Sequence, residues 1–172
     1  MSGSLVNIQT TTLSSPTSSV SLTGIDTTYN VYQCIVSGVK TATDDKDFYV
    51  KVTTSGTAQS TSNYNEVSKN LRVDTTFSNS SGSGNARWQP FSALGNASGE
   101  NGNCVFWLYN FGTTEYSMVT IESSYNVYDI DLFGMQGGGF YGVAEANDGI
   151  NFSLESGTNF SAGTFILNGL RT

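Results

Sequence analysis

Histidine is absent from this chain, and cysteine occurs only twice, as Cys34 and Cys104. Without an imidazole the chain cannot build a Ser-His-Asp or Cys-His nucleophile or a His-ligated zinc site, so most hydrolase mechanisms are excluded. Two thiols are too few for a disulfide framework or a four-thiolate zinc site. Both cysteines alternate with core positions, which favours buried apolar thiols and leaves one bridge between them open. We therefore expect no cofactor and no metal.

Charged residues are also scarce, at 12% of the chain. The chain has 7 basic and 14 acidic residues, which gives a net charge of −7. This balance repels phosphate backbones and anionic headgroups, which predicts no nucleic-acid and no membrane partner. The N-terminus has no basic, apolar leader and no run of 18 apolar residues occurs, so we expect neither a signal peptide nor a membrane span. In place of charge the chain has 24 serines, 21 threonines and 16 asparagines. Its surface is therefore predicted to be rich in hydroxyl and amide groups.

Apolar residues recur with a period of two. Phe48, Val50 and Val52 show the pattern, which is typical of a half-buried strand. With turn residues between such segments, the pattern predicts an all-β fold, an antiparallel β-sandwich, jelly-roll-like, with about eight to ten strands. The chain of 172 residues is expected to form one domain, residues 1–172, with a short extended N-terminal arm at about residues 1–12. The predicted strands lie at residues 5–12, 19–24, 32–37, 48–52, 104–109, 116–122, 128–132, 139–144, 150–154 and 164–170.

Three segments depart from simple alternation. Residues 104–109 are apolar or aromatic on both faces, which predicts a central strand whose second face needs a partner layer. Residues 64–71 have helix-like spacing with little apolar surface, so we expect at most one short helix or an ordered loop. Residues 77–85 are rich in serine and glycine and are predicted to form a long surface loop.

Acidic residues give only weak signs of catalysis. Asp129 and Asp131 are two apart in a predicted strand, so their Cα atoms would be about 6.6 Å apart on one face. Paired carboxylates catalyse glycoside hydrolysis, and Glu145 is a further carboxylate close in sequence. Two solvated carboxylates on the polar face of a strand are the favoured interpretation. We predict no catalytic residue.

Seven residues are candidates for a contact surface. The apolar part of the N-terminal arm is predicted to add a strand to a neighbouring molecule. The glycine run at residues 134–142 lacks the helix that a phosphate-binding loop requires, and it indicates a bulge or a close approach of a neighbouring subunit. Aromatic side chains serve as anchors both in protein interfaces and in sugar-stacking sites. The candidates are Leu5, Val6, Ile8, Trp88, Gly138, Phe140 and Tyr141.

Two stretches resemble small β-sandwich virion proteins of tailed bacteriophages. Residues 24–36, followed by Thr41-Ala42-Thr43-Asp44, are similar to a strand and an "x-A-T-D" turn of those proteins. Residues 149–170 are similar to their ending, "I-x-F-x-x-x-S-G-N-x-x-x-G-T-x-x-L-Y-G". Here Thr158 intervenes before the asparagine, and Asn168 stands where the family usually has tyrosine. The resemblance extends from about residue 20 to residue 170, with a less recognisable middle.

This resemblance implies a non-enzymatic, jelly-roll-like structural protein of the virion, assembled in the host cytoplasm. The first expectation is a capsid decoration (cement) protein that stabilises the assembled shell, with the major capsid protein or other virion proteins as partners and a homotrimer as its oligomer. The alternative is a tail or fibre module, an adaptor or receptor-binding unit, in which exposed Trp88 and Tyr141 contact host glycans. A third hypothesis is a glycan-cleaving enzyme that uses Asp129 and Asp131 or Glu145.

Overall fold

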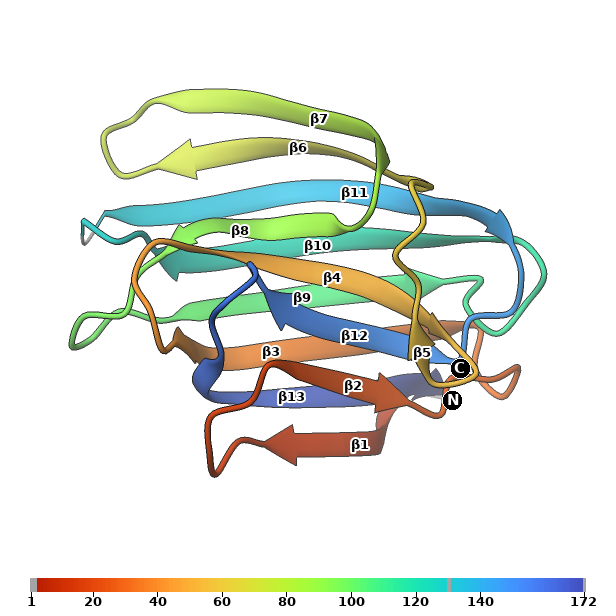
Figure 1. The fold of residues 1–172 in the computed structure, drawn as a ribbon. Helices are drawn as coiled ribbons and strands as arrows, with labels where there is room; N and C mark the ends of the chain where they lie inside the picture. Colours follow the sequence, from red (N-terminus) through yellow and green to blue (C-terminus); the bar gives the residue numbers. More distant parts are fainter. Residues whose placement is uncertain (1–2, 130, 172) are drawn as a thin grey trace.

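The computed structural model describes residues 3–129 and 131–171, and this part of the chain contains thirteen strands and no helix (Figure 1). All strand pairs are antiparallel, which confirms the predicted all-β sandwich. The larger sheet has the order β1 (Ser4–Thr12), β13 (Phe160–Arg171), β3 (Val31–Thr41), β9 (Gly102–Tyr109), β10 (Tyr116–Asn126), β11 (Leu132–Ala144), β6 (Tyr64–Arg72) and β7 (Phe77–Asn85). The smaller sheet has the order β2 (Ser19–Thr23), β12 (Gly149–Leu154), β4 (Lys46–Thr54) and β5 (Thr57–Ala58), and β8 (Trp88–Leu94) also pairs with β4.

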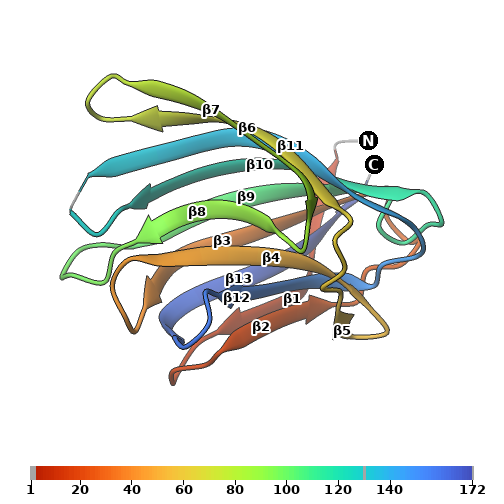
Figure 2. The ribbon, with the colours of Figure 1, turned by 45° about the horizontal axis from the view of Figure 1, so that its top comes forward.

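The connections follow a jelly roll. Strands β1, β13, β3 and β9 form one layer, and β2, β12, β4 and β8 form the other. The chain crosses between the layers from β1 to β2, from β2 to β3, from β3 to β4, from β8 to β9, from β11 to β12 and from β12 to β13. Such crossings wrap eight strands into two facing sheets. The larger sheet continues through β10, β11, β6 and β7, and the β6–β7 hairpin lies beyond β8 (Figures 1 and 2). We call this hairpin the β6–β7 overhang.

Aromatic side chains fill the space between the layers. The ring of Phe152 lies 5.7 Å from that of Phe48, 5.9 Å from that of Phe106 and 5.2 Å from that of Phe165. All four side chains are fully buried. They come from β12 and β4 on one side and from β9 and β13 on the other. Since burial of one such side chain stabilises by roughly 1.5–3 kcal/mol, this cluster joins the two sheets.

Three predictions about local structure are wrong. The segment predicted as a short helix or ordered loop is strand β6, and the predicted surface loop is strand β7. β6 pairs with β11 on one side and with β7 on the other, so backbone pairing overrides the weak local preferences of both segments. Asp129 lies in the turn between β10 and β11, and no single strand carries Asp129 and Asp131. These differences, with the unpredicted β5 and β8, raise the number of strands in the described residues to thirteen.

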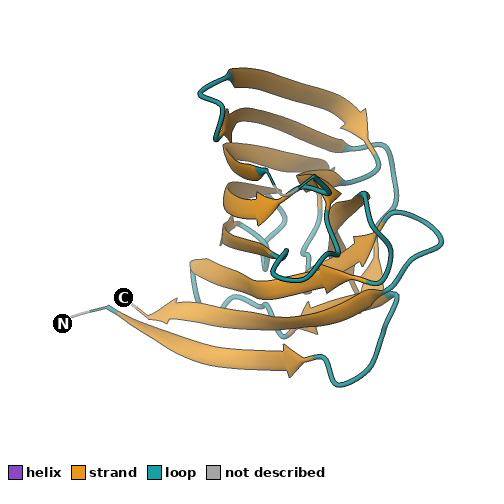
Figure 3. Ribbon diagram, turned by 90° about the vertical axis from the view of Figure 1, so that its left-hand side faces the viewer, coloured by secondary structure: helices purple, strands orange, loops and turns teal. Residues whose placement is uncertain are grey.

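The two candidate segments at the N-terminus and in the glycine run are both strands. β1 pairs along its length with β13 of the same chain, with one irregularity between Asn7 and Gln9. Figure 3 shows the ends of β1 and β13 together at one side of the molecule. The glycine run lies within β11, where a Cβ atom on Gly139 would be 2.5 Å from the carbonyl oxygen of Asn65 and 2.6 Å from Nε1 of Trp88. The glycine therefore permits a close approach within this chain.

Candidate functional site

The two faces of the larger sheet differ, as the alternating side chains of β9 show. Cys104, Phe106 and Leu108 point to the smaller sheet and are buried. Trp107 and Tyr109 alternate with them on the other face and are only half-buried. We call this second face the outer face. The sequence predicted a partner layer over it, and within residues 3–129 and 131–171 no strand covers it.

One row of residues crosses the outer face over all eight strands. Neighbours in this row are register partners in adjacent strands. No residue in the row is charged, although the chain as a whole carries a net charge of −7. This row is therefore uncharged, whereas the next row of the outer face contains Glu122 and Lys69. The row consists of Asn7, Asn168, Gln33, Trp107, Thr120, Gly138, Val67 and Ser81.

Apolar side chains flank this row. Met118 of β10 is the register partner of Tyr109 on one side and of Phe140 on the other. At the β1 edge, Leu5 is opposite Leu170. Met118 is 48% exposed and Leu5 is 47% exposed, whereas the inward-facing apolar residues of β3 and β9 are at most 3% exposed. Contiguous exposed apolar surface of this kind marks an interaction site.

Side-chain amides form a ladder at the β1 end of the row. Nδ2 of Asn7 donates to Oδ1 of Asn168 at 3.2 Å, and Nδ2 of Asn168 donates to Oε1 of Gln33 at 3.4 Å. Asn168 and Gln33 are nearly buried by their neighbours. Asn168, the residue that departs from the phage family's tyrosine, thus holds the centre of the ladder. Sequence reasoning missed Gln33 and Asn168 because alternation reveals a face and not the contacts across it.

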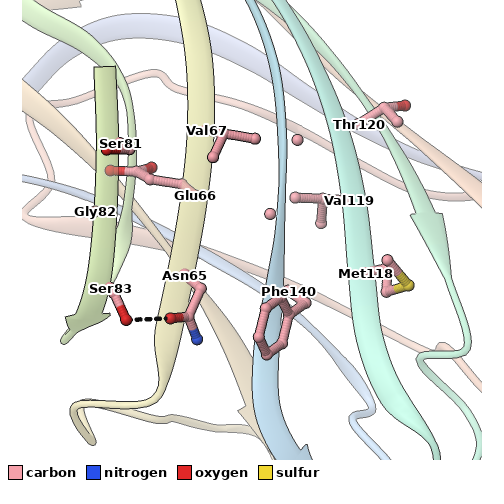
Figure 4. Close-up of a pocket in the computed structure, with 12 residues that line it drawn as sticks. Asn65, Glu66, Val67, Ser81, Gly82, Ser83, Met118, Val119, Thr120 and Phe140 are labelled. Carbon is pink, nitrogen blue, oxygen red and sulfur yellow. Dashed lines mark hydrogen bonds between the residues drawn. The ribbon is translucent and has the colours of Figure 1, made fainter. Parts of the chain in front are cut away.

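A hollow of about 590 Å³ lies over β11, where Gly138 lacks a side chain. Figure 4 shows Val67, Met118 and Phe140 projecting from three neighbouring strands around it. Ser83 closes one side and donates to Oδ1 of Asn65 at 2.7 Å. Candidate residues Gly138 and Phe140 are therefore brought together on the outer face.

Trp88 and Tyr141 lie in the core, so the prediction of exposed aromatic anchors at these positions is wrong. Trp88 packs edge-to-face on Tyr64, with ring centres 5.0 Å apart, and its indole nitrogen donates to the carbonyl of Asn65 at 3.2 Å. The ring of Tyr141 lies 4.8 Å from that of Tyr64. Both residues face inward by strand alternation, and neither side chain is accessible to a glycan.

The remaining candidates are split between the two faces of β1. Leu5 lies on the outer face, as its partner Leu170 does. Ile8 packs against the core, where its Cγ2 atom would contact a Cβ on Gly24 at 3.1 Å. Val6 is half-buried and alternates with Leu5, which places it on the inner face. Of the three candidates in β1, Leu5 alone has an exposed side chain, and the backbone edge of β1 away from β13 has no strand partner among the described residues.

A polar groove lies on the opposite face of the β6–β7 overhang, next to β8. Its larger hollow measures about 200 Å³ and its smaller neighbour about 130 Å³, and Glu66 and Gln89 line both. Oε2 of Glu66 accepts the Gln89 backbone N–H at 3.0 Å. Burial raises the pKa of Glu66, while the Gln89 N–H and the positive charge of Arg87 oppose this shift. The larger hollow is lined by Glu66, Ser68, Asn70, Ser80, Gln89, Pro90, Ser92, Tyr125 and Met135.

The carboxylates that could have formed a catalytic pair are not gathered in one site. Asp131 lies 3.9 Å from the guanidinium of Arg72, and Asp129 is exposed in the turn before β11. Glu145 follows the other end of β11 and accepts a hydrogen bond from the Thr54 hydroxyl at 3.0 Å. A strand of this length separates its ends by about 40 Å. Glu145 therefore cannot act together with either aspartate.

The two cysteines are free and buried, so the bridge that the sequence left open is not formed. Burial raises the pKa of the Cys34 thiol, and burial together with Cys34 raises that of Cys104. Both are therefore kept as neutral thiols, as the sequence predicted, and neither is a nucleophile. Among the described residues, no three histidine, cysteine, aspartate or glutamate side chains are placed to hold a metal ion.

The sequence matches no protein-family model and no curated protein. Over residues 3–129 and 131–171, no helix has the length and apolar character that crossing a membrane requires.

Proposed function

We propose that this protein is a non-enzymatic structural protein of a tailed-phage virion, a capsid decoration protein that stabilises the assembled shell. The observation that carries this proposal is the half-exposed apolar outer face of the eight-stranded sheet, around Trp107, Tyr109, Met118 and Phe140. A chain that works by burying surface against neighbours needs such a face, whereas an enzyme needs converging catalytic groups. The resemblance of residues 24–44 and 149–170 to phage virion proteins supports the same function.

The outer face is large enough for a specific contact. Eight strands spaced about 4.8 Å apart, with about 20 Å of each strand exposed, give roughly 700 Å². A standard interface buries about 800 Å² on each partner. The partners that we propose are the major capsid protein and neighbouring copies of this chain in a homotrimer. The open edge of β1 offers a second contact by strand addition.

Many small interfaces of this kind stabilise a shell by mass action. A protein that binds the assembled lattice and not its dissociated subunits shifts the equilibrium towards the lattice. Contacts to two or three neighbouring subunits at once also raise the apparent affinity. The expected location of the protein is therefore the virion surface, and hundreds of copies per particle are expected.

The first test is the number of copies in purified virions, measured by mass spectrometry against the major capsid protein. A ratio near one, or near a simple lattice fraction, is expected. A few copies per particle would overturn the decoration role and favour a tail or fibre module.

A second test targets the outer face directly. Met118→Glu places a charge in the apolar part of the outer face at an exposed position, so the fold should persist while attachment to particles is lost. Ser98→Glu adds the same charge on an exposed loop and should leave attachment unchanged. Equal attachment of both variants would contradict the role of the outer face.

A further inference from the structure

We propose that the polar groove between the β6–β7 overhang and β8 binds a neutral saccharide. Inward-facing positions of a β-sandwich are normally apolar because they pack against the other sheet. In β6 the inward positions after Tyr64 are instead Glu66, Ser68 and Asn70, and they are half-buried. They face β8, the last strand of its layer, so the overhang lines a groove with hydrogen-bonding groups.

An extended peptide is a poor occupant, because β8 has little free backbone to offer. Pro90 has no N–H, and its carbonyl already accepts the hydroxyl of Ser123 at 3.1 Å. The N–H of Gln89 donates to Glu66, and the N–H of Ser92 donates to the hydroxyl of Tyr125 at 3.4 Å. Strand addition at this edge is thus blocked, and a ligand has to bind through side chains.

The side chains in the groove match the groups of a sugar. Glu66 supplies a carboxylate acceptor, and Gln89 supplies an amide that both donates and accepts. Ser68, Asn70 and Ser92 add further hydroxyl and amide groups, while Tyr125 and Met135, at 4% and 6% exposed, form the buried floor of the hollow. The larger hollow, at about 200 Å³, equals six or seven water volumes of roughly 30 Å³ each, which is the size of one sugar ring.

Charge in the groove favours a neutral sugar over an acidic one. Arg87, in the lining of the smaller hollow, is the one basic residue in either lining, and the carboxylate of Glu66 offsets its charge. The guanidinium of Arg87 lies 3.7 Å from the ring centre of Tyr49, where it stacks on the aromatic face. Glu66 is also the one carboxylate in the linings of the two hollows, whereas glycoside hydrolysis requires a pair. The groove therefore binds a sugar and does not cleave it.

The experiment is saturation-transfer NMR on the full chain with glucose, galactose, N-acetylglucosamine and their short oligomers, and with glucuronic acid as the acidic comparison. Calorimetry follows for each sugar that shows transfer. Ser68→Val replaces a groove hydroxyl with methyl groups, and Gly137 beneath it has no side chain to clash. Ser81→Val makes the same change on the outer face of β7, outside the groove. We expect Ser68→Val to weaken binding at least tenfold and Ser81→Val to leave it unchanged.

A second variant distinguishes the loss of a contact with the sugar from the loss of the folded structure. Glu66→Gln keeps the shape of the side chain and an oxygen that accepts the Gln89 N–H, so a several-fold loss of affinity in a variant at least as stable to heat as the unaltered chain supports a direct contact. No transfer to any of these sugars, equal affinity of Ser68→Val and the unaltered chain, or preference for an acidic sugar would each overturn the proposal. Met118→Glu should abolish particle attachment without affecting sugar binding. The proposal of a sugar site and the proposal of a decoration role can therefore be refuted independently.

Discussion

The two halves of the larger sheet use the same alternation for opposite purposes. In β3 the inward residues Tyr32, Cys34 and Val36 are at most 2% exposed, because the smaller sheet covers them. In the β6–β7 overhang the inward residues Ser68 and Asn70 are polar and only half-buried, because the smaller sheet ends at β8. Strand alternation thus creates two faces, and the neighbouring layer decides whether a face serves stability or recognition.

The largest loss of stability should follow from a substitution in the half of the larger sheet that the smaller sheet covers. Phe152→Ala removes a ring that contacts the rings of Phe48, Phe106 and Phe165, and should lower the free energy of unfolding by about 3–5 kcal/mol. Chemical denaturation measures this loss. Val67→Ala on the outer face, where the side chain is 65% exposed, should cost less than about 0.5 kcal/mol. If both variants lost a similar free energy of unfolding, the outer face would contribute as much to stability as the covered core, which contradicts this comparison.

A smaller loss should follow at the junction between the covered half and the overhang. In β11, a Cβ on Gly139 would clash with the indole of Trp88 and with the backbone of Asn65. Gly139→Ala should therefore destabilise by about 1–3 kcal/mol, because Trp88 has to move from its place against Tyr64. Thermal unfolding measures the loss of stability, and Trp fluorescence reports the displacement of Trp88. Gly142→Ala is the control, since its nearest backbone contact is longer, at 3.3 Å. A Gly139→Ala variant as stable as the control would show that the indole is not held there.

The smallest effect should appear in the overhang itself and should depend on pH. Burial raises the pKa of Glu66 in the folded chain, so the stability that this group contributes is full below its unfolded pKa and is lost as pH rises through the folded pKa. Glu66→Gln should therefore be slightly more stable than the unaltered chain at neutral pH and equal to it in acid. Urea unfolding from acid to neutral pH measures this difference. A variant that is less stable at neutral pH would show that the Gln89 N–H and Arg87 outweigh burial.

Strands with strong alternation were predictable in detail. Residues 48–52 and 150–154 fall within β4 and β12, and residues 5–12 fall within β1. The double-sided apolar pattern of residues 104–109 correctly indicated a central strand, because β9 lies between β3 and β10. Residues 64–71 and 77–85 were not predictable as strands, since their pairing depends on backbone groups of β11 and of each other.

The candidate surface was predicted only in part. Leu5, Gly138 and Phe140 lie on the outer face, whereas Trp88 and Tyr141 are in the core. No local signal distinguishes an inward aromatic residue from an outward one when both faces of a strand carry aromatic residues. The groove around Glu66 could not be predicted from the sequence, because its lining residues come from five strands, β6, β7, β8, β10 and β11.

The sequence by itself determined the chemistry that is excluded, the all-β class and the alternation of the core strands, because these depend on residue types and on a period of two along one strand. Only the tertiary structure decided which apolar face is covered, where the β6–β7 overhang extends past β8, and which polar residues meet in a groove. The physical reason is that neighbouring strands come from distant parts of the chain, as the pairing of Asn7 in β1 with Asn168 in β13 shows. Local preference sets a strand's two faces, and the layers that pack on it set what each face does.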